Sequence, residues 1–181
     1  EFKSLGEITG GDVYIGCAES YQIRYLADMI KSFREQYPLL KYHITSGDTA
    51  QVAERLDRGL LDFAVIVEPP NLQKYNYIEL PACDTWGVIM RKDSPMVSKT
   101  AIAIEELIKL PLIVSRQGAT NEMPGWLQKN YDRLNIVATY DLIFNASILV
   151  KEGMGYALGF DKLVNTGAES ILCFRPIVPA I

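Results

Sequence analysis

The stretch Leu56–Ile66 most restricts the fold, because it joins the end of a helix to a strand. The apolar residues leading to Leu56 recur with helical spacing. Gly59 stands where the helix is expected to end with a residue in the left-handed conformation. The run Phe63–Val67 is continuously apolar, which predicts a strand buried on both faces. Such strands are typical of parallel sheets covered by helices on each side. The stretch therefore predicts an open α/β domain, in which ligands bind at the carboxyl ends of the strands.

The residues upstream complete a βαβαβ order. Asp12–Cys17 is predicted as the first strand, and a helix over Tyr21–Gln36 follows with apolar residues on one face. Pro38 ends this helix, because a proline biases the preceding residue away from helical geometry. Leu40–Thr45 is the second strand, and Ser46–Thr49 supplies a turn and an N-cap for the next helix.

A second α/β unit is predicted from Trp86 onward. Its expected elements are the strands Gly87–Met90, Leu112–Val114, Ile136–Tyr140 and Gly155–Gly159, and the helices Ile104–Ile108, Pro124–Tyr131 and Asn145–Lys151. Gly153 fits the C-cap of the last helix. Two crossings between the units, Leu80–Thr85 and the stretch near 167–172, predict a hinged clamshell with its ligand in the cleft.

Five motifs, in order along the chain, resemble the effector-binding domain of LysR-type transcriptional regulators. They are Gly11-x-Val13-x-Ile15-Gly16, Phe33-x-x-x-Tyr37-Pro38, Leu56-x-x-Gly59-x-Leu61-Asp62-x-Ala64-Val65, Leu107-x-x-Leu110-Pro111-Leu112-Ile113 and Leu149-Val150-x-x-Gly153-x-Gly155. The resemblance extends over nearly the whole chain. It implies two Rossmann-like subdomains joined by a two-strand hinge, which is the periplasmic-binding-protein type 2 clamshell.

The resemblance also implies where the parts begin and end. Residues 1–10 are expected as the end of a linker helix, 11–83 as subdomain I, 84–168 as subdomain II, and 169–181 as a return to subdomain I. The family continues with a further strand and a closing helix, so we expect the carboxyl-terminal part of subdomain I to be missing.

Composition excludes several classes of function. The 181 residues carry a formal net charge of −4, which argues against this chain binding nucleic acid by itself. No apolar run approaches the ~18 residues of a membrane span, so no membrane association is expected. The start, Glu1–Ser4, has neither an initiator Met nor a signal-peptide core, and a cytoplasmic fragment of a longer protein is predicted.

The cysteines and the single histidine give little support for a metal site. Cys17, Cys83 and Cys173 are far apart without a CxxC pair, so neither a metal nor a cofactor is predicted. Free, buried thiols are the favoured interpretation. The alternative is a redox-sensing thiol, for which Cys17 is the candidate because it ends a strand at the expected ligand-facing edge.

The loops that leave strands and enter helices form the expected effector site, because helix starts present exposed N–H groups. The resemblance implies that they line the cavity, which makes the candidate ligand-binding residues Ala18, Glu19, Ser20, Ser46, Gly47, Asp48, Glu68, Ser115, Arg116, Gln117, Asn145 and Ala146. Ser20, Ser46 and Thr49 are expected to donate hydrogen bonds to a carboxylate or phosphate, and Arg116 to clamp the same group. Helix capping is the alternative for each Ser, Thr and Asn, and a solvated surface charge for Arg116.

Three acids complicate the choice of effector. Glu19, Asp48 and Glu68 fall on the expected cleft edge of the first subdomain. Asp48 also fits a plain helix cap facing water. If Glu19 faces the cleft, the effector carries an amine, is neutral and polar, or relies on Arg116 to offset the acid.

The leading hypothesis is therefore an effector-sensing module of a bacterial transcription factor, without its DNA-binding domain. The resemblance implies a small-molecule effector, a homodimer that becomes a tetramer at full length, and promoter DNA bound through a helix-turn-helix domain outside this sequence. Tyr25, Met29 and the outer face of Leu40–Thr45 are the expected dimer surface, although Met29 also fits a position buried within the monomer. A solute-binding protein of a transporter and a small-carboxylate enzyme on the same scaffold are the alternatives. No convincing catalytic set is present, so an enzyme is not predicted.

Overall fold

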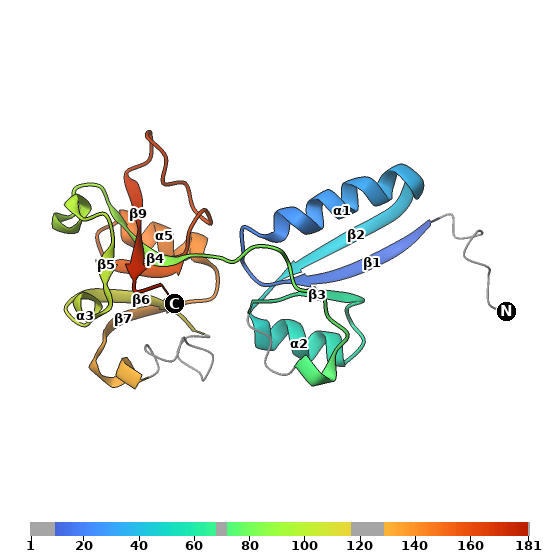
Figure 1. The fold of residues 1–181 in the computed structure, drawn as a ribbon, viewed down its shortest axis with the longest axis horizontal. Helices are drawn as coiled ribbons and strands as arrows, with labels where there is room; N and C mark the ends of the chain where they lie inside the picture. The colour runs from blue at the N-terminus through green and yellow to red at the C-terminus, as the bar shows by residue number, and fades with distance from the viewer. Residues whose placement is uncertain (1–9, 68–71, 117–128, 181) are drawn as a thin grey trace. The chain divides into compact units, whose positions relative to one another are not determined.

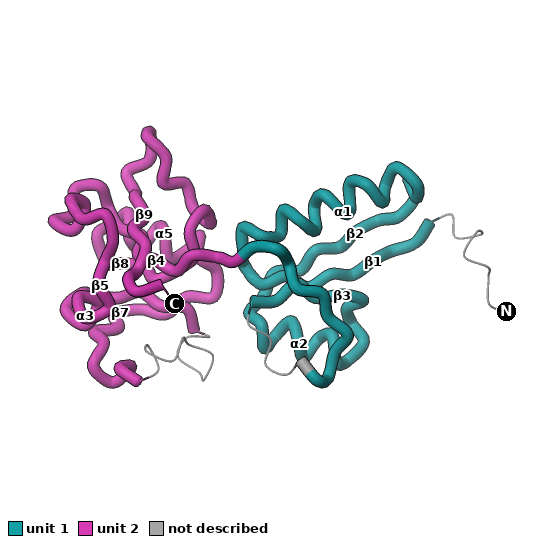
Figure 2. The backbone as a smooth tube through the Cα atoms, viewed as in Figure 1, with its two compact units in different colours: residues 1–82 teal, residues 83–181 magenta. Residues whose placement is uncertain are grey.

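The computed structural model describes residues 10–67, 72–116 and 129–180, and the chain folds into two compact units. Unit 1 comprises residues 1–82 and unit 2 comprises residues 83–181 (Figure 2). Both units combine helices with a sheet, which confirms the predicted α/β class. Some predictions lie outside the described residues: residues 1–9 of the linker helix, most of the helix 124–131, and the candidate ligand residues Glu68 and Gln117.

Unit 1 contains a parallel sheet in the order β2-β1-β3 (Figure 1). Its elements in chain order are β1 Gly10–Cys17, α1 Ile23–Gln36, β2 Leu39–Ser46, α2 Thr49–Asp57, β3 Phe63–Val65 and the 3-10 turn η2 Leu72–Lys74. The first crossover runs from β1 to β2, and the second runs from β2 back past β1 to β3, so the two cross the sheet in opposite directions. Right-handed connections therefore place α1 and α2 on opposite faces, as the ribbon shows (Figure 1).

Local signals at both ends of α2 confirm the sequence prediction. Asp48 is its N-cap, and Oδ1 of that side chain accepts a hydrogen bond from the amide of Gln51 at 2.7 Å. Gly59 ends the helical segment with a φ of +68°, a conformation that glycine adopts without steric cost. Between these ends, Val52 is buried against Gly16 of β1, where an added Cβ would lie 2.7 Å from Cγ1 of Val52. The glycine therefore sets how closely α2 approaches the sheet.

The strand predicted over Phe63–Val67 is shorter and less buried than its apolar run indicates. β3 spans Phe63–Val65 and pairs with β1 on one side only, at the edge of the described sheet. Phe63 is 63% exposed. The prediction of a strand buried on both faces was therefore wrong for unit 1, because an apolar sequence alone does not distinguish a central strand from an edge strand.

Unit 2 contains a mixed sheet of six strands in the order β5-β9-β4-β8-β6-β7. β6 is parallel to β7 and β8, whereas β4 runs antiparallel to β8 and β9. The elements are β4 Trp86–Arg91, η3 Pro95–Ser98, β5 Ile102–Ala103, α3 Ile104–Leu107, β6 Pro111–Ser115, η5 Tyr131–Arg133, β7 Asn135–Tyr140, α5 Ile143–Lys151, β8 Tyr156–Phe160 and β9 Leu172–Val178.

The central strands β4, β8 and β6 of unit 2 are buried on both faces, so here the sequence pattern holds. Successive residues of β4 alternate between two hydrophobic clusters, with Val88 in one and Ile89 in the other. α5 covers the second cluster through Ile143, Ala146 and Val150, which are at most 2% exposed. This burial fixes the first turn of α5 beside the ends of β6 and β7.

β9 belongs to unit 2. The sequence predicts that residues 169–181 return to subdomain I, but β9 pairs with β4 and β5 in the sheet of unit 2. Leu172, Cys173 and Ile177 are buried in the core of that unit. Among the residues described here, no helix is long and apolar enough to cross a bilayer.

Candidate functional site

The strand exits of unit 1 lie side by side, as parallel pairing requires. In register, Cys17 of β1 faces Ser46 of β2 on one side and Val65 of β3 on the other. The amide of Ala18 donates to the carbonyl of Val65 at 2.8 Å, and the amide of Gly47 donates to the carbonyl of Cys17 at 3.1 Å. Parallel pairing thus gathers the predicted residues on a unit-1 edge, defined as Ala18–Ser20 and Ser46–Thr49.

Of the predicted ligand residues on the unit-1 edge, Asp48 caps a helix and Ser20 stabilises a local turn. Oγ of Ser20, which is buried, accepts a hydrogen bond from the amide of Gln22 at 2.9 Å, just before α1. Asp48 caps α2, so its capping interpretation is confirmed. Thr49 is buried and donates from its Oγ1 to the carbonyl of Val67 at 3.0 Å. Ser46 is exposed and Glu19 is half-buried.

The exits of β6 and β7 form the corresponding place in unit 2. The amide of Arg116 donates to the carbonyl of Tyr140 at 2.8 Å, which continues the β6–β7 ladder by one step. Beyond it, Nε of Arg116 lies 3.0 Å from Oδ1 of Asp141, and both side chains are more than half exposed. α5 begins two residues later, with Asn145 exposed and Ala146 buried in its first turn. We define Ser115, Arg116, Asp141 and Asn145 as the unit-2 edge.

Asp141 is the residue that the sequence analysis missed. It directly follows β7 as Arg116 directly follows β6, and neighbouring parallel strands end at the same edge. That positional match was available from the sequence. Arg116 is exposed, as a solvated surface charge would be, and its guanidinium pairs with Asp141; its role as a clamp for a ligand stays a prediction.

Cys17 does not have the properties of a redox sensor. It is 2% exposed, and burial raises the pKa of its thiol. A reactive thiol needs access and a lowered pKa, so the inert interpretation is favoured. Cys173 is likewise buried, whereas Cys83 is exposed, which corrects the expectation that all three thiols are buried.

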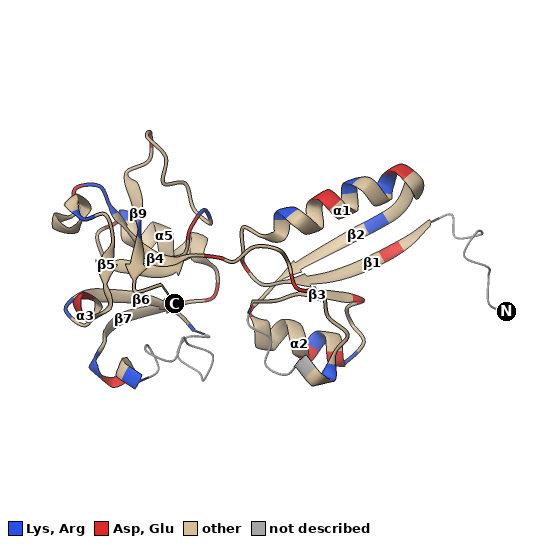
Figure 3. Ribbon diagram, viewed as in Figure 1, with Lys and Arg blue, Asp and Glu red and all other residues tan. Residues whose placement is uncertain are grey.

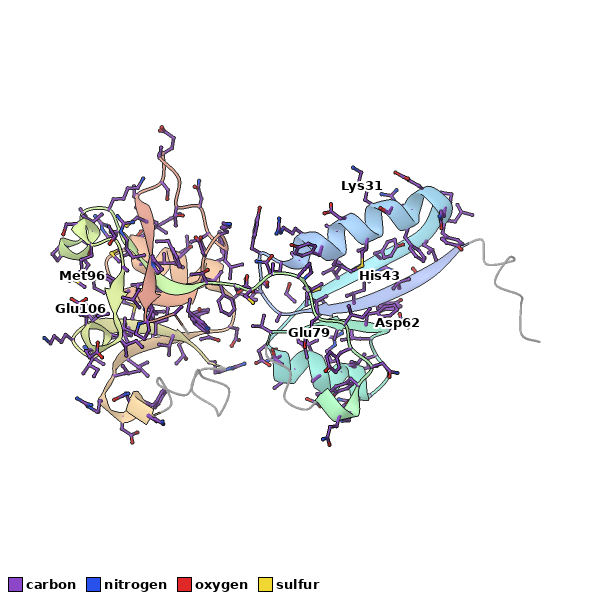
Figure 4. The ribbon with its side chains drawn as sticks, viewed as in Figure 1. Lys31, His43, Asp62, Glu79, Met96 and Glu106 are labelled. Carbon is purple, nitrogen blue, oxygen red and sulfur yellow. The ribbon has the colours of Figure 1, made fainter. Side chains whose placement is uncertain are left out.

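The charged and metal-ligating residues that the structure describes form no metal cluster. No group of three His, Cys, Asp or Glu among them is placed to hold a metal ion. Lys and Arg positions are interspersed with Asp and Glu positions along the ribbon of both units (Figure 3). His43 lies on β2, where its ring stacks on Tyr14 at 4.7 Å and its Nε2 lies 2.8 Å from Oδ1 of Asp12 (Figure 4).

The comparison with protein families decides the identity. The family described as LysR substrate binding domain matches residues 7–179. The chain belongs to this family. The HTH-type transcriptional regulator YvbU of Bacillus subtilis, itself uncharacterized, is 24% identical over 148 residues, which are 82% of this chain and 50% of that protein. The chain thus spans about half the length of this curated relative.

Solved LysR effector-binding domains share the fold. The regulatory domain of Synechocystis CcmR in complex with 2-PG aligns with a TM-score of 0.71 at 20% identity, covering 93% of this chain and 81% of that chain. The effector-binding domain of QuiR in complex with shikimate aligns with a TM-score of 0.70 at 13% identity, again covering 93% and 81%. These matches confirm the type 2 periplasmic-binding-protein fold. The LysR relatives are transcriptional regulators rather than enzymes or transporter components, so the two alternative functions find no support.

Proposed function

We propose that this LysR effector-binding domain senses a small polar metabolite and passes the signal to a DNA-binding domain outside this chain. The observation that carries the proposal is the placement of polar loops at the carboxyl ends of parallel strands in both units. Ligands of α/β sheets bind at such ends, because helix starts there present N–H groups. CcmR with 2-PG and QuiR with shikimate show domains of the same fold with small polar molecules.

Each edge, taken by itself, is a proposed place for contacts with a small polar ligand. Ser46 and Asn145 are exposed, and their side chains are of a type that can donate hydrogen bonds to a ligand. Ser20, Gly47 and Asp48 shape the unit-1 edge through their caps and turns, and backbone amides of the same loops add donors. Arg116 supplies the positive charge of the unit-2 edge.

A thermal-shift screen of this chain tests the proposal. The compounds are aliphatic and aromatic carboxylates, amino acids, polyamines, sugar phosphates and nucleotides. A ligand that binds only the folded state adds about 2.7 kcal/mol at a hundredfold excess over its dissociation constant. Ser46→Ala and Asn145→Ala should each reduce the shift, whereas Ser98→Ala, an exposed serine of η3, should not. If no compound class stabilises the chain, the proposal is wrong.

A second proposal concerns assembly. Tyr21, in the turn just before α1, and Tyr25, Met29 and Phe33 within the helix recur every four residues, and Tyr21, Met29 and Phe33 are 41%, 56% and 54% exposed. We call these four residues the α1 ridge. Ridges with this spacing pack against other helices, and Tyr and Met are enriched in interfaces. The exposure of Met29 argues against its burial within the monomer and supports a homodimer through α1.

The remaining features of the full-length regulator extend this proposal. They are a cytoplasmic tetramer that binds promoter DNA through a helix-turn-helix domain, with effector binding changing the contacts between subunits. Such coupling requires that the effector bind one arrangement more tightly than another. The HTH-type relatives, of which this chain matches about half, support the presence of a separate DNA-binding part in those proteins.

A further inference from the structure

The unit-2 edge presents two opposite charges at fixed positions. Arg116 and Asp141 are the first residues after two paired parallel strands, and the hydrogen bond between the amide of Arg116 and the carbonyl of Tyr140 fixes their backbones. Their side chains are 56% and 58% exposed and meet at 3.0 Å. The positions of these charges therefore follow from the sheet, while their charged groups remain open to solvent.

The pair is poorly explained as a device for stability. Exposed ion pairs contribute roughly 0.2–1 kcal/mol, because water screens the charges and ordering the side chains costs entropy. The contact engages Nε of Arg116 and Oδ1 of Asp141. A guanidinium has five N–H donors and a carboxylate has two acceptor oxygens, so each group can bind a further partner without giving up this contact.

We propose that Arg116 and Asp141 form a subsite for a zwitterion, a ligand that carries an ammonium beside a carboxylate, as an α-amino acid does. Arg116 binds the ligand carboxylate through its remaining N–H groups, and Asp141 accepts hydrogen bonds from the ligand ammonium. This inference rests on the proposed effector-sensing function and names the chemical class of the effector.

Charge balance distinguishes this class from simple anions and simple amines. An anion at Arg116 also meets Asp141, and two unit charges 4 Å apart interact by about 1 kcal/mol in water and more near a protein surface. Attraction and repulsion then nearly cancel, whereas a zwitterion meets an opposite charge at each end.

Titration calorimetry on this chain, with matched ligand series, tests the inference. The series are α-amino acids, the same compounds without the amino group, and the same compounds without the carboxyl group. At least one amino acid should bind tenfold or more tightly than both of its matched analogues. In Asp141→Asn, the affinity for that amino acid should fall at least tenfold, and the affinity for the deaminated acid should rise relative to it. In Arg116→Gln, the affinity for the amino acid should fall, and the affinity for the matched amine should stay unchanged.

A control and two contrary outcomes complete the experiment. Arg58→Gln removes another exposed pair, Arg58–Glu54 at 3.4 Å, and should leave ligand affinity unchanged. If the best ligand lacks an ammonium and Asp141→Asn leaves its affinity unchanged, the zwitterion subsite is wrong while effector sensing stands. If no compound of any series or of the wider screen binds, effector sensing by this chain fails and the subsite with it.

Discussion

The carboxylate of Asp57 accepts a hydrogen bond from the hydroxyl of Tyr75 at 2.8 Å, across 18 positions of sequence. The ammonium of Lys74 bonds to the other oxygen of the same carboxylate and lies 5.5 Å from the centroid of the Tyr75 ring. Asp57 is the last residue of α2, where the helix dipole disfavours an acid. The two donors offset this effect, and they tie the segment after β3 back to the end of α2.

We expect Asp57→Asn to change how the stability of the folded chain depends on pH. The bonds from Lys74 and Tyr75 hold the pKa of Asp57 below its ordinary value. A lowered pKa in the folded state stabilises the protein above the unfolded-state pKa, about 3.9, and this stability is lost as the pH falls through the lower folded pKa. The melting temperature of wild type should therefore be higher than that of Asp57→Asn at neutral pH, and the difference should shrink below about pH 4.

Asp28→Asn provides the control for this pH series, because Asp28 is an exposed acid on the other helix of unit 1. Its melting temperature should follow wild type from neutral to acidic pH. A constant difference between wild type and Asp57→Asn over the whole range would show that the loss comes from packing or helix propensity, not from the ionised carboxylate.

Substitution of the α1 ridge should separate assembly from folding. Phe33→Glu replaces an exposed ring with a charged side chain. Within the chain, that ring stacks on Tyr37 with 5.2 Å between the centroids. The monomer should keep its secondary structure, while the mass in solution should fall from that of a dimer to that of a monomer by light scattering. Lys31→Glu is the matched control, since it introduces the same side chain on α1 outside the ridge (Figure 4). An unchanged mass for Phe33→Glu would remove the ridge from the interface.

Local signals explain why much of the fold could be predicted from sequence. The cap at Asp48 and the turn at Gly59 act through neighbouring backbone groups, so both ends of α2 follow from residues close in the chain. The helix predicted over Tyr21–Gln36 is observed at Ile23–Gln36, because Gln22 rather than an earlier residue is its N-cap. Gly153 has a φ of +80° just after α5, as its C-cap prediction requires.

Features that depend on distant partners could not be predicted. The exposure of Phe63 reflects the edge position of β3, which is set by strand order and not by the apolar run itself. The bond between Asp57 and Tyr75 joins residues that no local pattern associates. Within the candidate site, the exits of β6 and β7 could be inferred, but the contact between Arg116 and Asp141 required the parallel register.

Gly155→Ala should destabilise the chain through a backbone clash. A Cβ at this position would lie 2.4 Å from the carbonyl oxygen of Pro111, and β6 is held between β7 and β8 so that it cannot easily move away. Such overpacking costs typically about 1–3 kcal/mol, which urea denaturation measures. Gly153→Asn should cost much less, because asparagine tolerates a positive φ and nothing lies within 4 Å of the added Cβ. Equal losses would mean that β6 relaxes around the new methyl group.

The three thiols should react at very different rates in the folded protein. Cys17 and Cys173 are 2% and 5% exposed, and burial raises the pKa of both, so little thiolate is present or accessible near neutral pH. Cys83 is exposed and should be modified first by a disulfide reagent. In Cys83→Ser, the fast phase should disappear, leaving only slow labelling that accelerates to completion in denaturant. Rapid modification of Cys17 in the folded chain, located by peptide mapping, would contradict its inert assignment and restore it as a redox-sensing candidate.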